Sequence, residues 1–274
     1  MVGRGPRDEV AGGEFPATFF LLEEPAEPGT MVVLPPGETH HALRVLRLGR
    51  GAVVPATDGR GGRYRLRLEF DPGDAGSCPA LVLERTDEPP PRPAIEVGLG
   101  AGRRERFLWG VEKLTELEVA RVTPLLSAAV RDRKALAGEA GRRLSARARA
   151  RAAAAVKQSK GTHLPQFGPL EEPVAWAGRP FAGVSLLLAM PAPGIPPLAA
   201  AATALCRPGS AGAGFRLAVG PEGGFLAEEE RALAEAGFVP VHLGPRRLRF
   251  ETAVVAAVCQ VRAVFALEDA ECGS

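Results

Sequence analysis

The chain has 274 residues, of which 46% are hydrophobic, and a formal net charge of +2. That length is enough for one large domain or two ordinary ones with a sizeable core. No apolar run approaches the length of a membrane span and no apolar leader is present, so we expect neither membrane insertion nor secretion. The scattered cysteines, without CxxC spacing, favour a reduced, cytoplasmic protein.

Basic residues are concentrated in two stretches. Residues 131–160 carry ten Lys and Arg against two acids, and residues 40–67 carry seven arginines against one. Two such stretches in a chain near neutrality are typical of a protein that binds a polyanion. The alternative is an ordinary solvated surface on which arginine replaces lysine.

The N-terminal part has the pattern of a small all-β domain. Residues 1–14 are rich in Gly, Pro and charge and predict an extension without fixed structure. Thr39 is expected to cap a short helix that runs to Leu46. Residues 63–70 then alternate strictly between charged and apolar side chains, which predicts a strand with one buried face and one face of arginines. Further strands are expected at residues 52–56 and 81–85.

After the proline-rich segment 88–93, which we interpret as a stiff linker, strands and helices alternate. This pattern is typical of an α/β sheet. We expect strands at residues 95–100, 119–126, 183–190, 215–219 and 239–243, and helices around residues 107–117, 142–160, 198–205 and 253–267.

Two glycine loops in the last quarter of the chain each lead from an apolar strand into a helix. The first is GPEGGF at residues 220–225, and the second is LGPRRLRFET at residues 243–252. Glycine at such a turn lets the backbone approach a ligand closely, because no Cβ stands in the way. Two such turns one strand apart predict a single shared site.

The residues around the first loop argue against a phosphate ligand. The following helix opens with Glu228, Glu229 and Glu230. The chain also lacks the Gly-Lys-Ser/Thr ending of a P-loop and the GxGxxG dinucleotide fingerprint at these loops. A neutral or cationic ligand therefore fits better.

The two loops resemble those of the bacterial ribosomal small-subunit (16S) RNA uridine-N3 methyltransferases of the SPOUT, or trefoil-knot, class. Further resemblance lies in HHALRVLRLGRG, DGRGGRY, VEKLTELEVARVTPLL and the KQS and LPQ triplets. The resemblance implies an α/β fold, with a C-terminal SPOUT-type trefoil-knotted domain at residues 94–270 and an N-terminal PUA-like β-barrel at residues 15–88. The chain departs from the usual family pattern at Glu118, where Gly is usual, and at Phe250, where a smaller residue is usual. Phe250 either packs on a neighbouring helix or stacks on a base.

The resemblance also implies the ligands and partners. The cofactor is S-adenosyl-L-methionine, whose sulfonium is cationic, and the substrate is 16S ribosomal RNA of the small subunit. A homodimer is expected, because the family's cofactor pockets lie beside a two-fold interface and the final helix is apolar on more than one face. We expect no metal, since His40 and His41 are adjacent and have no cysteine or acid cluster beside them.

Site residues are carried over from the matching loops. The expected cofactor contacts are Met190, Gly220, Glu222, Gly223, Leu243, Gly244, Leu248 and Arg249. Arg249 is also the candidate catalytic residue, because an arginine can stabilise the negative charge of a deprotonated uracil ring. Glu251 is the second catalytic candidate, to orient Arg249 or to receive the proton. The alternative is a helix-start acid with Arg249 as its surface partner.

The expected RNA contacts are Arg44, Arg47, Arg63, Arg65, Arg147, Arg149, Arg151 and Gln158. Two other functions remain open. A SPOUT ribose 2′-O-methyltransferase would share the cofactor loops but not the leading β domain or the LRFET stretch. A non-catalytic RNA-binding ribosome assembly factor would keep the basic surfaces without an intact pocket, and the paired glycine loops count against it.

Overall fold

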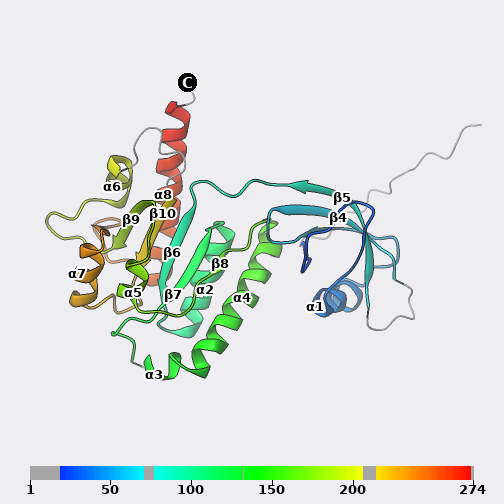
Figure 1. The fold of residues 1–274 in the computed structure, drawn as a ribbon, viewed down its shortest axis with the longest axis horizontal. Coiled ribbons are helices and arrows are strands. Elements are labelled where there is room, and N and C mark those ends of the chain that lie inside the picture. The colour runs from blue at the N-terminus through cyan, green and yellow to red at the C-terminus, as the bar shows by residue number, and fades with distance from the viewer. Residues whose placement is uncertain (1–18, 71–76, 132, 206–213, 273–274) are drawn as a thin grey trace, which may run out of the picture.

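The computed structural model describes residues 19–70, 77–131, 133–205 and 214–272, so the extension predicted for residues 1–14 lies outside it. The described chain forms two sheets, which lie at opposite ends of the molecule (Figure 1). The N-terminal sheet has the strand order β1-β3-β4-β5-β2, and the C-terminal sheet has the order β11-β9-β10-β6-β7-β8. Strand β5 leads across to β6 and joins them (Figure 1).

The N-terminal sheet is built from short, mostly antiparallel strands. Its elements are β1 Phe20–Leu21, β2 Met31–Val33, the helical turns α1 Pro36–His40 and η1 His41–Val45, β3 Val53–Thr57, β4 Gly62–Leu68 and β5 Pro79–Asp87. The alternation predicted for residues 63–70 is confirmed, because Tyr64, Leu66 and Leu68 are buried in the core of this sheet. The intervening arginines lie on the opposite face.

The helix of this part begins earlier than the sequence suggested. α1 starts at Pro36, because proline suits the first turn of a helix, where its missing N–H needs no partner. Thr39 is therefore inside the helix and is not its cap. Its hydroxyl donates instead to the carbonyl oxygen of Leu34 at 2.9 Å.

The C-terminal sheet is parallel throughout and is covered by helices on both faces. Its strands are β6 Ile95–Gly100, β7 Arg121–Leu125, β8 Gln166–Phe167, β9 Gly183–Leu188, β10 Gly214–Val219 and β11 Val239–Val241. Its helices are α2 Arg104–Glu116, α3 Arg133–Leu136, α4 Glu139–Ser159, α5 Pro173–Ala177, α6 Leu198–Leu205, α7 Ala227–Glu235 and α8 Phe250–Cys272. The main core lies between the sheet and α2, α4, α6 and α8, and a smaller one lies under α5 and α7.

A partly buried arginine on α8 accompanies the unusual residue at the end of α2. Glu118 has a φ of +52°, in the left-handed region that normally favours glycine. Arg262 of α8 donates from Nη2 to the carbonyl oxygens of Leu117 and Glu118, at 2.7 Å and 3.0 Å. The guanidinium thus satisfies carbonyls that the helix end leaves free, and this compensates for the missing glycine.

The turn at residues 58–62 joins the N-terminal sheet to the end of α4. Gly61 N–H donates to the carbonyl oxygen of Thr162, and Leu164 N–H donates to that of Gly59, both at 2.8 Å. Backbone hydrogen bonds therefore fix the two parts relative to each other. Among the described residues, no helix is both long and apolar enough to cross a bilayer.

Candidate functional site

A cleft opens where β9, β10 and β11 end. These three strands are neighbours in the sheet, so the loops that follow their carboxyl ends converge. The cleft has a volume of about 220 Å³. Ligands of open parallel sheets bind at this edge, so the cleft lies where a small-molecule site is expected.

Both glycine loops line this one cleft, as their spacing predicted. Seven of the eight residues expected at the cofactor are in its wall, namely Met190, Gly220, Glu222, Gly223, Leu243, Gly244 and Leu248. Arg249 is not among the lining residues, but it lies between two that are, Leu248 and Phe250. It therefore sits at the rim.

The glycines of the cleft are needed for different reasons, and Gly244, with a φ of +145°, is also needed for its backbone conformation. A Cβ on Gly220 would come within 2.9 Å of the backbone nitrogen of Phe225, so the turn itself has no room for a side chain. A Cβ on Gly223 or Gly244 would meet no protein atom within 4 Å. At these two positions the backbone faces open space, which a ligand can approach closely.

The side chains of the cleft are partly apolar. Met190 and Leu248 keep 53% and 36% of their surface exposed, which is high for large apolar residues. Phe250 is buried and packs toward α2, where a Cβ on Gly110 would lie 3.5 Å from its ring. Phe250 is therefore a packing residue, the first of the two alternatives raised for it.

The carboxylate of Glu222 is turned toward the start of α2. It accepts the N–H of Arg103 at 3.2 Å and 3.4 Å, and it occupies the space that a Cβ on Gly102 would need. A carboxylate is favoured there by the positive end of the helix. Glu222 thus anchors the first loop to α2.

Arg106 connects the two loops, and sequence reasoning missed it. Its Nε lies 3.3 Å from Oε1 of Glu251 and 3.9 Å from Oε1 of Glu222. Arg247 Nη2 also donates to the carbonyl oxygen of Glu222 at 3.5 Å. The only sequence signal for Arg106 is its place in the helix after β6, and its proximity to both loops depends on β6 pairing with β10.

The two catalytic candidates do not form a pair. Glu251 is paired with Arg106, and its Oε2 is buried without a hydrogen-bond partner. Arg249 is exposed, and within the described part of the chain its side chain has no ion-pair or hydrogen-bond partner. The expectation that Glu251 orients Arg249, or is its surface partner, is therefore wrong, because Arg106 takes that position.

Three charged residues of the cleft were also missed, Glu230, Arg246 and Arg247. Burial raises the pKa of the Glu230 carboxyl above its ordinary value. Its signal was the acidic run that opens α7, although the run does not tell which of its acids faces the cleft.

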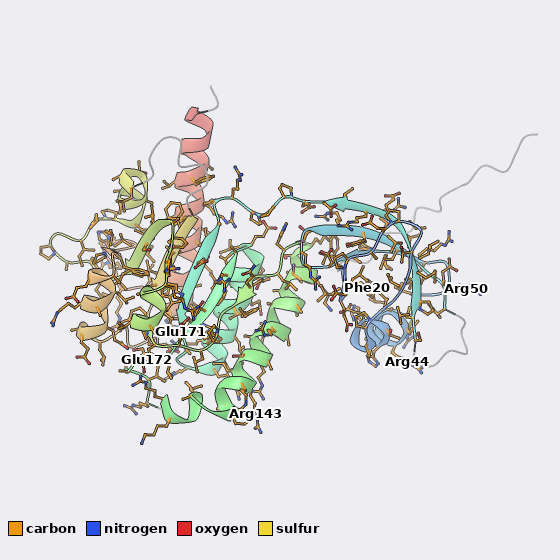
Figure 2. All side chains as sticks on the ribbon, in the orientation of Figure 1. Phe20, Arg44, Arg50, Arg143, Glu171 and Glu172 are labelled. Carbon is orange, nitrogen blue, oxygen red and sulfur yellow. The ribbon has the colours of Figure 1, made fainter. Side chains whose placement is uncertain are left out.

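The expected RNA contacts are spread over both parts of the molecule. Arg44, Arg47, Arg147, Arg149 and Gln158 are exposed. Others carry partners: Arg63 binds Glu88 at 2.6 Å, Arg65 binds Glu84, and Arg151 binds Glu112 at 2.8 Å. Figure 2 shows Arg44, one of the expected contacts, beside α1, and Arg143, which was not among them, near the start of α4.

Comparison with known proteins gives matches over both parts of the chain. A family model described as an RNA methyltransferase domain matches residues 88–262, and one described as an RNA methyltransferase PUA domain matches residues 34–73. The second match confirms a PUA-like part in the N-terminal region, beside the α/β fold of the rest.

Similar proteins and structures agree with these models. Ribosomal RNA small subunit methyltransferase E of Mycobacterium tuberculosis is 29% identical over 248 residues, covering 88% of this chain and 90% of the relative. The protein of that name from Synechocystis is 29% identical over 271 residues, covering 94% and 82%.

Among solved structures, ribosomal RNA small subunit methyltransferase E of Neisseria gonorrhoeae, bound to S-adenosyl methionine, superposes with a TM-score of 0.73 at 27% identity. That match covers 90% of this chain and 97% of the other. Since the methyltransferase model alone spans more than half of its residues, this chain belongs to the RNA methyltransferase family.

Proposed function

We propose that this protein methylates N3 of a specific uridine in the 16S ribosomal RNA of the small subunit, with S-adenosyl-L-methionine as the methyl donor. The observation that carries the proposal is the single cleft formed by the two glycine loops, with open space before Gly223 and Gly244. The relatives named ribosomal RNA small subunit methyltransferase E support the substrate, and the Neisseria structure supports the cofactor.

The residues of the cleft fit this cofactor. The backbone at Gly220, Gly223 and Gly244 allows close approach, and the exposed apolar side chains of Met190 and Leu248 suit an adenine ring. Leu243 and the backbone of Glu222 complete this wall. When bound, the cofactor supplies an electrophilic methyl group on a positively charged sulfur, and Glu230 provides a carboxyl group on the cleft wall.

In the proposed reaction the new bond joins uridine N3 to the methyl carbon, the bond from that carbon to sulfur breaks, and the N3 proton leaves. Arg249, at the rim, donates to the uracil oxygens and stabilises the negative charge that deprotonation puts on them. Glu251 receives the proton, directly or through water. The ion pair with Arg106, at 3.3 Å, holds the Glu251 carboxylate in place for this role.

The remaining features of the proposal concern the whole protein. The PUA-like part at residues 15–88 and α4 of the part at residues 94–270 bind the RNA through their arginines, and the second part is a SPOUT-type trefoil knot. The protein is a homodimer, with the apolar helix α8 at the interface. A ribosomal substrate also suits the cytoplasmic location that the scattered cysteines favour.

Nucleoside mass spectrometry of 16S ribosomal RNA from a deletion strain tests the reaction. We expect 3-methyluridine to be missing and to return when the purified protein and S-adenosyl-L-methionine are added to small subunits from that strain. Loss of a 2′-O-methylated nucleoside instead would establish the ribose methyltransferase. Calorimetry that detects no cofactor binding would favour the non-catalytic assembly factor.

A further inference from the structure

A second cleft lies on the other side of the first glycine loop. It has a volume of about 750 Å³. Its walls are the start of α2, the segment that follows β7, and residues 221–223 of the loop. Those three loop residues also line the first cleft, so only this short stretch of chain separates the two.

The position of the second cleft follows from the order of the strands. β10, β6 and β7 are neighbours, and the loops after their carboxyl ends form its walls. The first cleft uses the ends of β9, β10 and β11. The loop after β10 is therefore the wall that the two clefts share. Ligands bound in the two clefts would be separated only by this loop.

The second cleft is strongly basic. Its lining includes Arg103, Arg104 and Arg131. Arg104 pairs with its neighbour Glu105, but in the part of the chain that the structure describes the side chains of Arg103 and Arg131 have no ion-pair partner. Two arginines from different elements, without an ion-pair partner among the described residues, thus line one cleft.

The acid in the lining of this cleft is held by groups other than the side chains of Arg103 and Arg131. Glu222 is the one acid among the described residues that line the cleft, and its carboxylate accepts the N–H of Arg103 and lies near Arg106. It therefore leaves Arg103 and Arg131 available for an external anion. Arginine is the side chain best suited to bind phosphate, through its planar fork of donors.

We propose that this second cleft binds the phosphodiester backbone of the RNA beside the target uridine. The proposal rests on the proposed function, because it takes the first cleft as the cofactor site. A base that is to be methylated at N3 has that atom in its pairing edge, so its strand must be unpaired locally and held beside the cofactor. Phosphate contacts fix the register of such a strand, and Arg103 and Arg131 supply them next to the shared wall.

The test is the double charge reversal Arg103→Glu with Arg131→Glu, probed with a single-stranded oligouridylate over a salt series. Each lost phosphate contact lowers the slope of log affinity against log salt by roughly 0.7 for a single strand, so we expect a decrease of about 1.4. Cofactor affinity by calorimetry should stay within about two-fold, which also shows that the variant is folded.

Two further variants serve as controls. Arg92→Glu with Arg231→Glu makes the same change of net charge at two exposed residues outside both clefts, and it should leave the slope nearly unchanged. Arg103→Lys with Arg131→Lys keeps the charges and should keep most of the slope. A double reversal that binds the oligouridylate like the Arg92 and Arg231 variant overturns the proposal. Absence of methylation by the natural protein would instead refute the proposed function. The salt dependence of oligouridylate binding would still test whether Arg103 and Arg131 contact RNA.

Discussion

The two glycine loops of the cofactor cleft are held in different ways. The first, residues 220–225, is fixed from within by the hydrogen bond from Gly224 N–H to the carbonyl oxygen of Pro221 at 2.7 Å. It is fixed from outside by the anchor of Glu222 on α2. The second, residues 243–252, has Gly244 N–H bonded to His242 Nδ1 at 3.1 Å, one long contact from Arg247 and the ion pair of Glu251 with Arg106. Its residues 245–249 are exposed.

From this difference we infer that the two loops have different functions. The first loop is a preformed wall, so a ligand that binds against it does not have to order it. In the second loop the side chain of Arg249 has no hydrogen-bond or ion-pair partner among the described residues, as expected of a group that acts on a bound substrate. Four substitutions, taken from the largest expected effect to the smallest, test the contrast.

Gly223→Val puts a branched side chain into the open space before the first loop. The position has ordinary backbone geometry and free room, so the fold should keep its melting temperature, whereas cofactor binding should be lost. Calorimetry with S-adenosyl-L-methionine measures this. Gly49→Val, at an exposed glycine with equally open space, is the matched control. Near-normal affinity in the Gly223 variant would mean that the cofactor does not lie against this wall.

Arg249→Ala tests the second loop. Loss of one donor that stabilises transition-state charge costs on the order of a hundred- to a thousand-fold in rate, with little loss of cofactor affinity. The defect should be partly relieved at high pH, where the uracil ring loses its proton without help. Single-turnover methylation over a pH series checks both points. If chemistry is normal and cofactor binding is weak, Arg249 is a cofactor contact and the catalytic group is another residue.

Arg106→Ala tests whether the connection between the loops matters. Its ion pairs are partly exposed, and such a pair contributes up to about 1 kcal/mol, or roughly five-fold in an equilibrium constant. We expect cofactor affinity to fall by up to about that factor and Arg106→Lys to restore part of it. Arg104→Ala, which removes only an exposed pair with Glu105, is the control. Equal effects at the two positions would show that Arg106 does not position the loops.

Much of the fold followed from local patterns. The strands Ile95–Gly100 and Gly214–Val219 and the helix Leu198–Leu205 lie almost where periodicity and composition placed them. The meeting of the two glycine loops was also predictable, because strand-to-helix turns of one parallel sheet share an edge.

The side-chain partners inside the site could not be predicted in this way. Glu222 faces α2 and Glu251 faces Arg106 because β6 pairs with β10, a contact between residues more than a hundred positions apart. Thr39 failed as a cap for a local reason, since Pro36 already starts the helix. Spacing along the chain thus located the cleft, while strand order decided which charges meet in it.

The smallest effect is expected at Glu230, which lines the cleft beside the first loop. Burial raises the pKa of this carboxyl in the folded protein, so folding favours its protonated form. The free energy of unfolding of the natural protein therefore decreases as the pH rises through the ordinary range of a carboxyl pKa and above. The Glu230→Gln variant is neutral at this position at every pH and does not show this decrease. The melting temperature of the variant should exceed that of the natural protein by about a few degrees at neutral pH, and the gap should close as the pH falls below about 4. Glu228→Gln, at an exposed acid of the same helix, should show no such trend. A gap that stays constant with pH would mean that burial of the charge is not what separates the two proteins, and lower cofactor affinity in the Glu230 variant would show that the ionised carboxylate is kept for the ligand.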